Sequence, residues 1–244
     1  PLQEWIKGKL TYALLRELEK SQWFDAKALR ELQFRSLRRH LDFAYREVPY
    51  YTRLLDEHEL QPSRIQSFED FSRIPYLTRD DLRRHFAEMQ PRRRRRGVQA
   101  MSTGGSTGSP VTVLVDREGA ALADAIRLRC HRWYDAGPGT REIALWGSPI
   151  ESTKQDRVRT LRDRLINSKF LSAFDLGEAT LARYAQMVRQ YRPQKLFGYA
   201  SALALLAGYL RREGWRPDPG SVRAGFNTAA PLYDLQPALV GSVF

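Results

Sequence analysis

The feature that most constrains the fold is an alternation of short β-rich runs with amphipathic helical stretches after residue 97. The β-rich runs are Val111 to Val115, Glu142 to Trp146, Lys195 to Phe197 and Val222 to Phe226. Between them lie helical stretches, which are Asp116 to Trp133, Asp175 to about Tyr191 and Ser201 to Arg212, the first two with Asp as the cap. Strands joined by helices of this length need crossover connections, which predicts a parallel or mixed sheet covered by helices.

The first part of the chain follows a different pattern, in which only helices are indicated. Apolar residues recur at helical spacing between residues 3 and 47, and Pro49 interrupts the pattern. Two helix starts follow, Ser67 with Asp70 and Thr78 with Asp81, each spaced as a capping box in its Asp variant. We therefore predict an α/β fold in two parts, a helical N-terminal portion (1–95) and an α/β portion (96–244).

The net charge of +12 limits the classes of partner. A basic surface attracts nucleic acid and anionic membranes without sequence-specific contacts, but the Arg residues here are spread over every predicted helix. The exception is the run from Arg92 to Arg96, which has no interleaved aromatic residues that could stack on bases. We interpret this run as a mobile loop and do not expect nucleic acid as a partner. An Arg-rich module that binds polyanions remains an alternative.

The cysteine and histidine content gives little sign of metal or redox chemistry. Cys130 is the single cysteine, so no internal disulfide can form, and its apolar neighbours indicate a small buried side chain. The chain has neither a signal-peptide pattern nor an apolar stretch long enough to cross a bilayer, which favours a cytoplasmic protein. We expect no protein metal site, because no metal-ligand spacing links Cys130 to the histidines, which are His40, His58, His85 and His131.

The most informative motif is the loop from Met101 to Pro110, which lies directly before the predicted strand at 111–115. Its three glycines (Gly104, Gly105 and Gly108) allow a close approach of the backbone that side chains would prevent. Five hydroxyl residues add donors, and exposed N–H groups of such a loop can bind phosphate oxygens. The loop therefore predicts a site for a triphosphate. We accordingly expect the α/β portion (96–244), which contains this loop, to be the nucleotide-binding portion.

Other interpretations of this loop remain. Composition alone would also fit an ordinary Gly/Ser turn. A Walker loop needs a Lys after its last Gly, where Ser109 and Pro110 stand, and the glycine spacing does not fit a dinucleotide fingerprint. The segment from Gly104 to Gly108 does match the G-x-S-x-G elbow of serine hydrolases, with Ser106 as nucleophile. A strand, not a helix, follows it, and only His131 comes later, yet the hydrolase alternative stays open.

The same loop resembles the phosphate loop of the adenylate-forming superfamily, roughly T-S-G-S-T-G-x-P, with Gly104 in place of Ser. The Lys that many members carry after the Pro is Val111 here, as is common in the phenylacetate-CoA ligase branch. Further segments resemble that branch and the related capsular-polysaccharide-biosynthesis proteins, and they are Tyr45 to Tyr51, Phe68 to Leu82 and Pro193 to Leu206. The likeness covers the chain from about residue 36 to its end.

The resemblance implies site residues. Those expected around the nucleotide phosphates are Thr103, Gly104, Gly105, Ser106, Thr107 and Gly108. Those expected around the adenine are Thr228, Ala229, Ala230 and Pro231, with Ala230 replacing the family Glu. Strand ends are where α/β sheets bind ligands, and the acyl-pocket candidates there are Trp146, Gly147, Gly198, Tyr199 and Ser201. Each aromatic candidate, taken alone, also fits a core side chain.

The function implied by the resemblance is ATP-dependent activation of a carboxylic acid as an acyl adenylate, followed by thioester formation with coenzyme A. Mg²⁺ should accompany the ATP. The family's metal-linked acid, ribose-binding Asp and catalytic Lys would lie after Phe244, so we expect an N-terminal part that lacks the small C-terminal domain and is inactive alone. No catalytic residue is assigned, the acid is not identified, and a homodimer stays open. A noncatalytic nucleotide-binding scaffold, consistent with Ala230, is an alternative.

Overall fold

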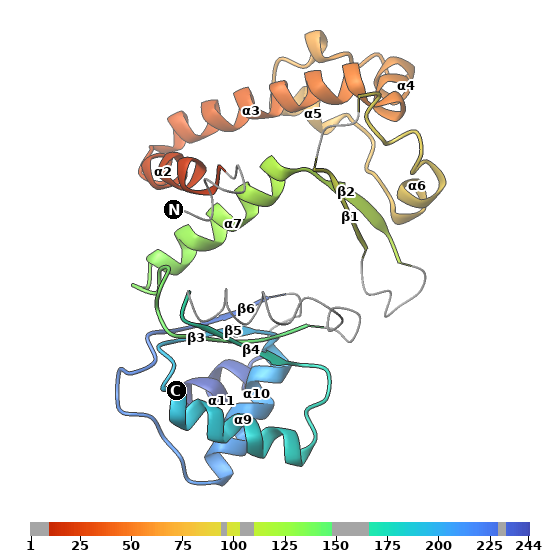
Figure 1. Ribbon diagram of the computed structural model, residues 1–244. Helices are drawn as coiled ribbons and strands as arrows, with labels where there is room; N and C mark the ends of the chain where they lie inside the picture. Colours follow the sequence, from red (N-terminus) through yellow and green to blue (C-terminus); the bar gives the residue numbers. More distant parts are fainter. Residues whose placement is uncertain (1–9, 94–96, 103–109, 148–165, 229–232) are drawn as a thin grey trace. The chain divides into compact units, whose positions relative to one another are not determined.

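The chain forms two compact units, within residues 1–127 and 128–244, which we call the helical unit and the sheet unit. The computed structural model describes residues 10–93, 97–102, 110–147, 166–228 and 233–244 (Figure 1). The first strand described begins at Gln99, close to the expected change of pattern at residue 96. The boundary between the compact units nevertheless lies later in the sequence than residue 96, after Arg127. The reason is that a separate two-stranded ribbon belongs to the same unit as the first helices. The assignment of 96–244 as a nucleotide-binding domain stays a prediction.

The helical unit begins with two helices that the sequence predicted as one region, α2 (Thr11–Ser21) and α3 (Ala26–Glu47). Asp25 starts α3, since its Oδ1 accepts a hydrogen bond from the Ala28 N–H at 2.7 Å. The helix ends before Pro49, as predicted, and Pro49 becomes the first residue of α4 (Pro49–Glu57). Proline is well tolerated there because the N–H that it lacks has no partner within a helix.

A small core holds these helices together. Leu41, Leu55, Leu60 and Ile65 are all buried and come from α3, the end of α4 and the segment around η1 (Pro62–Arg64). Tyr45 packs against this core, and its hydroxyl donates to Asp56 Oδ1 at 2.9 Å. The long α3 is therefore anchored near its C-terminal end.

Both predicted capping boxes are present. Ser67 starts α5 (Phe68–Ser72), where the Asp70 N–H donates to Ser67 Oγ at 3.1 Å and Asp70 Oδ2 accepts from the Ser67 N–H at 3.0 Å. Thr78 and Asp81 form the same reciprocal pair at the start of α6 (Arg79–Arg84). These contacts span three residues, so the local sequence was enough to predict them.

The first residue of the arginine run is not part of a free loop, which corrects our interpretation for Arg92. Its N–H donates to the Glu47 carbonyl at 2.7 Å, and its guanidinium donates to the Arg46 carbonyl at 2.8 Å. Carbonyls at a helix C-terminus lack helical partners, and Arg92 satisfies two of them at the end of α3. Arg93 is exposed, and residues 94–96 of the run lie outside the described residues.

The two-stranded ribbon consists of β1 (Gln99–Ser102) and β2 (Thr112–Val115), paired antiparallel with Ser102 opposite Thr112. β2 was predicted, whereas β1 was missed because its four residues are all exposed and show no alternation. After the ribbon, α7 (Arg117–Arg132) begins where Asp116 Oδ1 accepts from the Gly119 N–H at 2.7 Å. This bond confirms Asp116 as the predicted cap.

The sheet unit contains four parallel strands in the order β4-β3-β5-β6. Their bounds are β3 (Glu142–Trp146), β4 (Ser168–Ser172), β5 (Lys195–Gly198) and β6 (Ala224–Asn227). The parallel sheet confirms the predicted α/β class. β4 was missed, and β6 begins two residues later than the β-rich run indicated.

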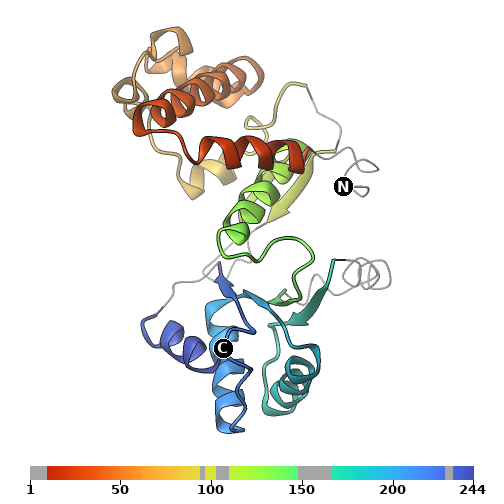
Figure 2. The same cartoon turned by 90° about the vertical axis from the view of Figure 1, so that its left-hand side faces the viewer.

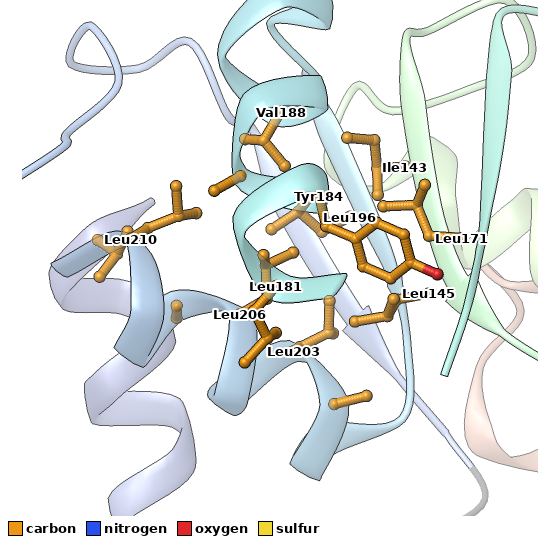
Figure 3. Close-up of a cluster of buried hydrophobic side chains, with 14 residues drawn as sticks. Ile143, Leu145, Leu171, Leu181, Tyr184, Val188, Leu196, Leu203, Leu206 and Leu210 are labelled. Atoms are coloured by element: carbon orange, nitrogen blue, oxygen red, sulfur yellow. The ribbon is translucent and has the colours of Figure 1, made fainter. Parts of the chain in front are cut away.

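Helices α9 (Glu178–Tyr191), α10 (Ala200–Arg212) and α11 (Leu235–Val243) lie on one side of this sheet in both views (Figure 1, Figure 2). The buried core between them and the strands includes Ile143, Leu145, Leu196 and Leu206 (Figure 3). One predicted cap was wrong. The N-cap of α9 is Gly177, and Asp175 instead accepts from the Gly177 N–H at 3.1 Å, in the turn before the helix.

Among the helices that the structure describes, none combines the length and the apolar character needed to span a membrane. Cys130 is half-buried, a little more accessible than the sequence indicated.

Candidate ligand-binding edge of the parallel sheet

The carboxyl ends of β3, β5 and β6 meet at one edge of the sheet, and the acyl-pocket candidates follow them. Alternate residues of a strand face opposite sides of a sheet. Because Ile143, Leu145 and Leu196 point into the core with α9 and α10, Trp146 and Phe197 lie on the opposite face. This face of the sheet, near the strand ends, is the one on which the candidate side chains gather.

Two of the predicted residues form an aromatic pair at this edge. The rings of Trp146 and Tyr199 are stacked, with centroids 4.3 Å apart and an angle of 18° between their planes. Phe197 adds a third ring, 5.7 Å from that of Trp146. All three side chains are half-buried. Tyr199 packs against the core, whereas Trp146 and Phe197 do not belong to that core cluster, so the three rings form an aromatic group beside the strand ends.

The two predicted glycines at this edge have distinct structural reasons. Gly147 has a φ of 110°, a backbone conformation that side chains disfavour. Gly198 lies against β3, where an added Cβ would clash with Leu145. The backbone around Gly198 is also hydrogen-bonded to β3 on one side and to the residue after β6 on the other. The Tyr199 N–H donates to the Leu145 carbonyl at 3.3 Å, and the Thr228 N–H donates to the Gly198 carbonyl at 3.2 Å.

The N-terminus of α10 adds electrostatic character to the edge. The helix starts directly after Tyr199, and no side chain accepts a hydrogen bond there as an N-cap. Unpaired N–H groups at a helix N-terminus carry partial positive charge, which favours a nearby anion such as a carboxylate. Ser201 stands in this first turn with an exposed side chain.

The structure describes six of the residues that the sequence put forward for a site. It brings Trp146, Gly147, Gly198, Tyr199 and Thr228 to one sheet edge, with Ser201 exposed beside them. The other candidates lie outside the described residues, and they are Thr103, Gly104, Gly105, Ser106, Thr107, Gly108, Ala229, Ala230 and Pro231. A role in ligand binding stays a prediction for every one of these residues.

The sequence analysis missed a polar cluster on the same face of the sheet, at the amino ends of the strands. Glu142 and Lys195 form a buried ion pair, with 2.7 Å between Lys195 Nζ and Glu142 Oε2. His131, which lacked metal-ligand spacing in the sequence, is buried. Opposite charges at the first positions of two predicted strands were the available signal, since parallel pairing would align them.

We find no cluster of three or more His, Cys, Asp or Glu side chains suited to a metal ion in the described part of the chain.

Comparison with known proteins gives matches over most of the chain. A relative named phenylacetate-coenzyme A ligase, from Thermus thermophilus, is 26% identical over 218 residues, which cover 83% of this chain and 45% of that protein. The protein CapK from Staphylococcus aureus is 21% identical over 212 residues, which cover 84% of this chain and 46% of CapK. These matches support the phenylacetate-CoA ligase-like branch of adenylate-forming proteins. No family model matches the chain.

Solved structures agree with this branch in fold. One of 2-hydroxyisobutyryl-CoA ligase, in an open conformation with 2-HIB-AMP and CoA, gives a TM-score of 0.64 at 20% identity and covers 89% of this chain and 53% of that one. Another structure of the same ligase, in the postadenylation state with R3-HIB-AMP, gives a TM-score of 0.66 at 20% identity. It covers 89% of this chain and 48% of that one. The chain thus spans about half the length of the relatives and structures that it matches.

The segments that resemble the phenylacetate-CoA ligase-like branch include connections between helices and strands of this fold. Residues 45–51 form the junction between α3 and α4, and 68–82 run from the first residue of α5 through the Thr78 capping box into α6. Residues 193–206 run from the start of β5 through Gly198 into α10. The last of these segments therefore builds the candidate edge.

Proposed function

We propose that this chain contributes the acyl pocket and part of the nucleotide site of an enzyme that activates a carboxylic acid with ATP. In this reaction the carboxylate attacks the α-phosphate, pyrophosphate leaves, and the resulting acyl adenylate passes its acyl group to the thiol of coenzyme A. The observation that supports the proposal most is the Trp146–Tyr199 stack at the carboxyl edge of a parallel sheet, where Tyr199 belongs to a segment that resembles acid-CoA ligases.

Each candidate group has a task in this proposal. The stacked rings form an apolar wall for the acyl chain, and the N-terminus of α10 attracts its carboxylate. Gly198 lets β3 and β5 approach so closely that the wall sits directly beside the strand ends. The hydroxyl and N–H groups of 103–108 would neutralise charge on the phosphates during displacement, and Thr228 would lie near the adenine.

Mg²⁺ fits this arrangement only as a companion of the nucleotide. It usually keeps several waters and binds through substrate phosphates with one or two carboxylates, so it does not need a cage of protein ligands. Bound to ATP, the ion would supply charge neutralisation at the phosphates.

The described strands argue against the hydrolase alternative. A nucleophile elbow joins a strand to the helix that follows it. Here the segment with Ser106 connects β1 to β2, which pair antiparallel as a ribbon. His131, the histidine that follows Ser106 within these 244 residues, is 2% exposed, and its Nδ1 lies 3.4 Å from Lys195 Nζ, a setting unsuited to activating a nucleophile.

The proposal can be tested by acid-dependent exchange of pyrophosphate into ATP, measured on the intact gene product that carries this sequence. A panel of aryl and aliphatic acids would identify the substrate class. Trp146→Ala should raise the KM for the acid, whereas Trp133→Ala should not, because Trp133 is an exposed ring that packs on Arg129 away from the edge. Exchange that no acid stimulates, or ester hydrolysis without ATP, would contradict the proposal.

A further inference from the structure

The face of the sheet that carries Trp146 also carries a polar cluster at its other end. Glu142, Ser168 and Lys195 are the first residues of β3, β4 and β5, and the parallel register places them side by side. Lys195 Nζ lies 2.7 Å from Glu142 Oε2, and Ser168 Oγ donates to Glu142 Oε1 at 3.1 Å. The Lys195 and Glu142 side chains are only 6% and 11% exposed. The ion pair is therefore held in place by strand pairing and sheltered from water.

His131, near the end of α7, joins this cluster. Its Nδ1 lies 3.4 Å from Lys195 Nζ, which also contacts the Ala136 carbonyl at 3.4 Å. An ammonium group can only donate, so Nδ1 is the acceptor in this contact. The imidazole orientation is thus fixed by the lysine, and through the lysine by Glu142.

An aromatic row leads from His131 to the candidate edge. The ring of His131 lies 4.1 Å from that of Phe226 and 6.2 Å from that of Phe197. Phe197 then contacts Trp146, which stacks on Tyr199. Tightly packed rings have few alternative positions, so a shift at one end displaces the others. The row therefore connects the buried ion pair to the wall of the proposed acyl pocket.

We propose that His131, Glu142 and Lys195 are positioning residues, which fix the Trp146–Tyr199 stack through this aromatic row. A buried ion pair adds little net stability compared with apolar side chains of the same size, because both charges lose their hydration. What such a pair supplies is a defined geometry. The link between the cluster and the stack stands on the contacts alone, whereas its effect on an acyl ligand rests on the proposed function.

The first test follows Trp146 without any ligand. In a variant of this chain that keeps Trp146 as its sole tryptophan, through Trp5→Phe, Trp23→Phe, Trp133→Phe and Trp215→Phe, acrylamide quenching reports how accessible that ring is. We expect Lys195→Met to raise the quenching constant about twofold, since loosening of the row exposes the ring. His131→Leu, which removes both the Nδ1 acceptor and the aromatic ring, should act in the same direction.

A double variant separates positioning from stability. Lys195→Met with Glu142→Leu removes both charges, so the unpaired carboxylate that destabilises the single variant is gone and the urea midpoint should recover. Quenching of Trp146 should nevertheless stay raised. The matched control is Val188→Ala, which opens a cavity on the opposite face of the same sheet and should lower stability with quenching unchanged. Normal quenching in the double variant, or raised quenching in Val188→Ala, would overturn the proposal.

The second test uses pyrophosphate exchange by the intact gene product. The double variant should raise the KM for the acid about tenfold, equivalent to ~1.4 kcal/mol of binding, with kcat changed far less, and Val188→Ala should leave that KM unchanged. If quenching responds as expected but no acid supports exchange, the proposed function fails and the positioning role stands. If exchange occurs and the double variant has a normal KM and normal quenching, the positioning role fails.

Discussion

A Cβ atom placed on Gly198 would lie 2.3 Å from the carbonyl oxygen of Leu145. The two residues are partners in the pairing of β5 with β3, and this oxygen also accepts a hydrogen bond from the Tyr199 N–H. The glycine is therefore required by the closeness of the neighbouring backbone at the point where Tyr199 turns toward Trp146.

Gly198→Ala should lower the free energy of unfolding by about 1–3 kcal/mol, the usual cost of forcing an extra group into a packed site. Urea denaturation followed by far-UV circular dichroism measures this. Gly225→Ala is the matched control, because Gly225 lies on β6 of the same sheet and an added Cβ there meets nothing within 4 Å. Equal stability of the two variants would show that β3 and β5 do not approach each other as described.

The capping box of α5 should make stability depend on pH. Hydrogen bonds from the Gln66 N–H and then from the Ser67 side chain hold the pKa of Asp70 below its ordinary value of 3.8. A carboxyl whose pKa is lower in the folded state stabilises the fold above its unfolded pKa, and the contribution is lost as the pH falls through the folded value. Asp70→Asn should therefore lower the melting temperature at pH 7 and have a shrinking effect below about pH 4.

Asp81 should behave in the same way, because its pKa is lowered mainly by the Thr78 hydroxyl. Asp80→Asn is the control at the same helix start. Its carboxylate pairs with Arg83 at 3.2 Å and takes no part in the capping box. Asp80→Asn should therefore lower the melting temperature at pH 7 much less than Asp81→Asn does. A melting-temperature difference for Asp81→Asn that persists unchanged to pH 2 would contradict the assignment of the cap.

Arg92 and Arg93 should differ as trypsin sites. Trypsin must take the arginine side chain into its specificity pocket, and the Arg92 side chain is engaged with the Arg46 carbonyl and with Thr52 Oγ1 at 2.8 and 3.3 Å. In limited digestion followed by mass spectrometry, the bond after Arg93 should be cut before the bond after Arg92. Arg92→Ala should also cost about 1 kcal/mol of stability, and Arg93→Ala almost nothing. First cleavage after Arg92 would show that this contact is not maintained in solution.

Replacing Ser106 separates adenylation from ester hydrolysis in the intact gene product. If the hydroxyl is one phosphate donor among several, Ser106→Ala should reduce acid-dependent pyrophosphate exchange by about two to three orders of magnitude at most. Thr107→Ala should reduce the exchange by a similar amount, and the double variant should reduce it much further. A nucleophile would instead lose nearly all of its rate. Covalent labelling of Ser106 by ester-type inhibitors would overturn the adenylation proposal.

Features that depend on neighbours in the sequence were predictable. The Ser67 and Thr78 capping boxes each join residues three apart, and the Asp116 cap likewise uses a nearby N–H. β3 was predicted at its observed bounds because Ile143 and Leu145 are buried apolar residues between turn signals. The candidates Trp146 and Tyr199 could be chosen because Trp146 ends a predicted strand and Tyr199 comes soon after another.

The sequence by itself thus determined most of the helices, most strands and the α/β class, since these follow from periodicity and local hydrogen bonds, whereas α11 was not predicted. Tertiary structure decided the rest. β4 is a strand through its pairing with β3, and the order β4-β3-β5-β6 depends on which strands meet. His131 and Lys195 are 64 residues apart, and Trp146 stacks on Tyr199 only after β3 and β5 pair in register. Contacts of this kind arise from the closure of long loops, which local sequence patterns do not encode.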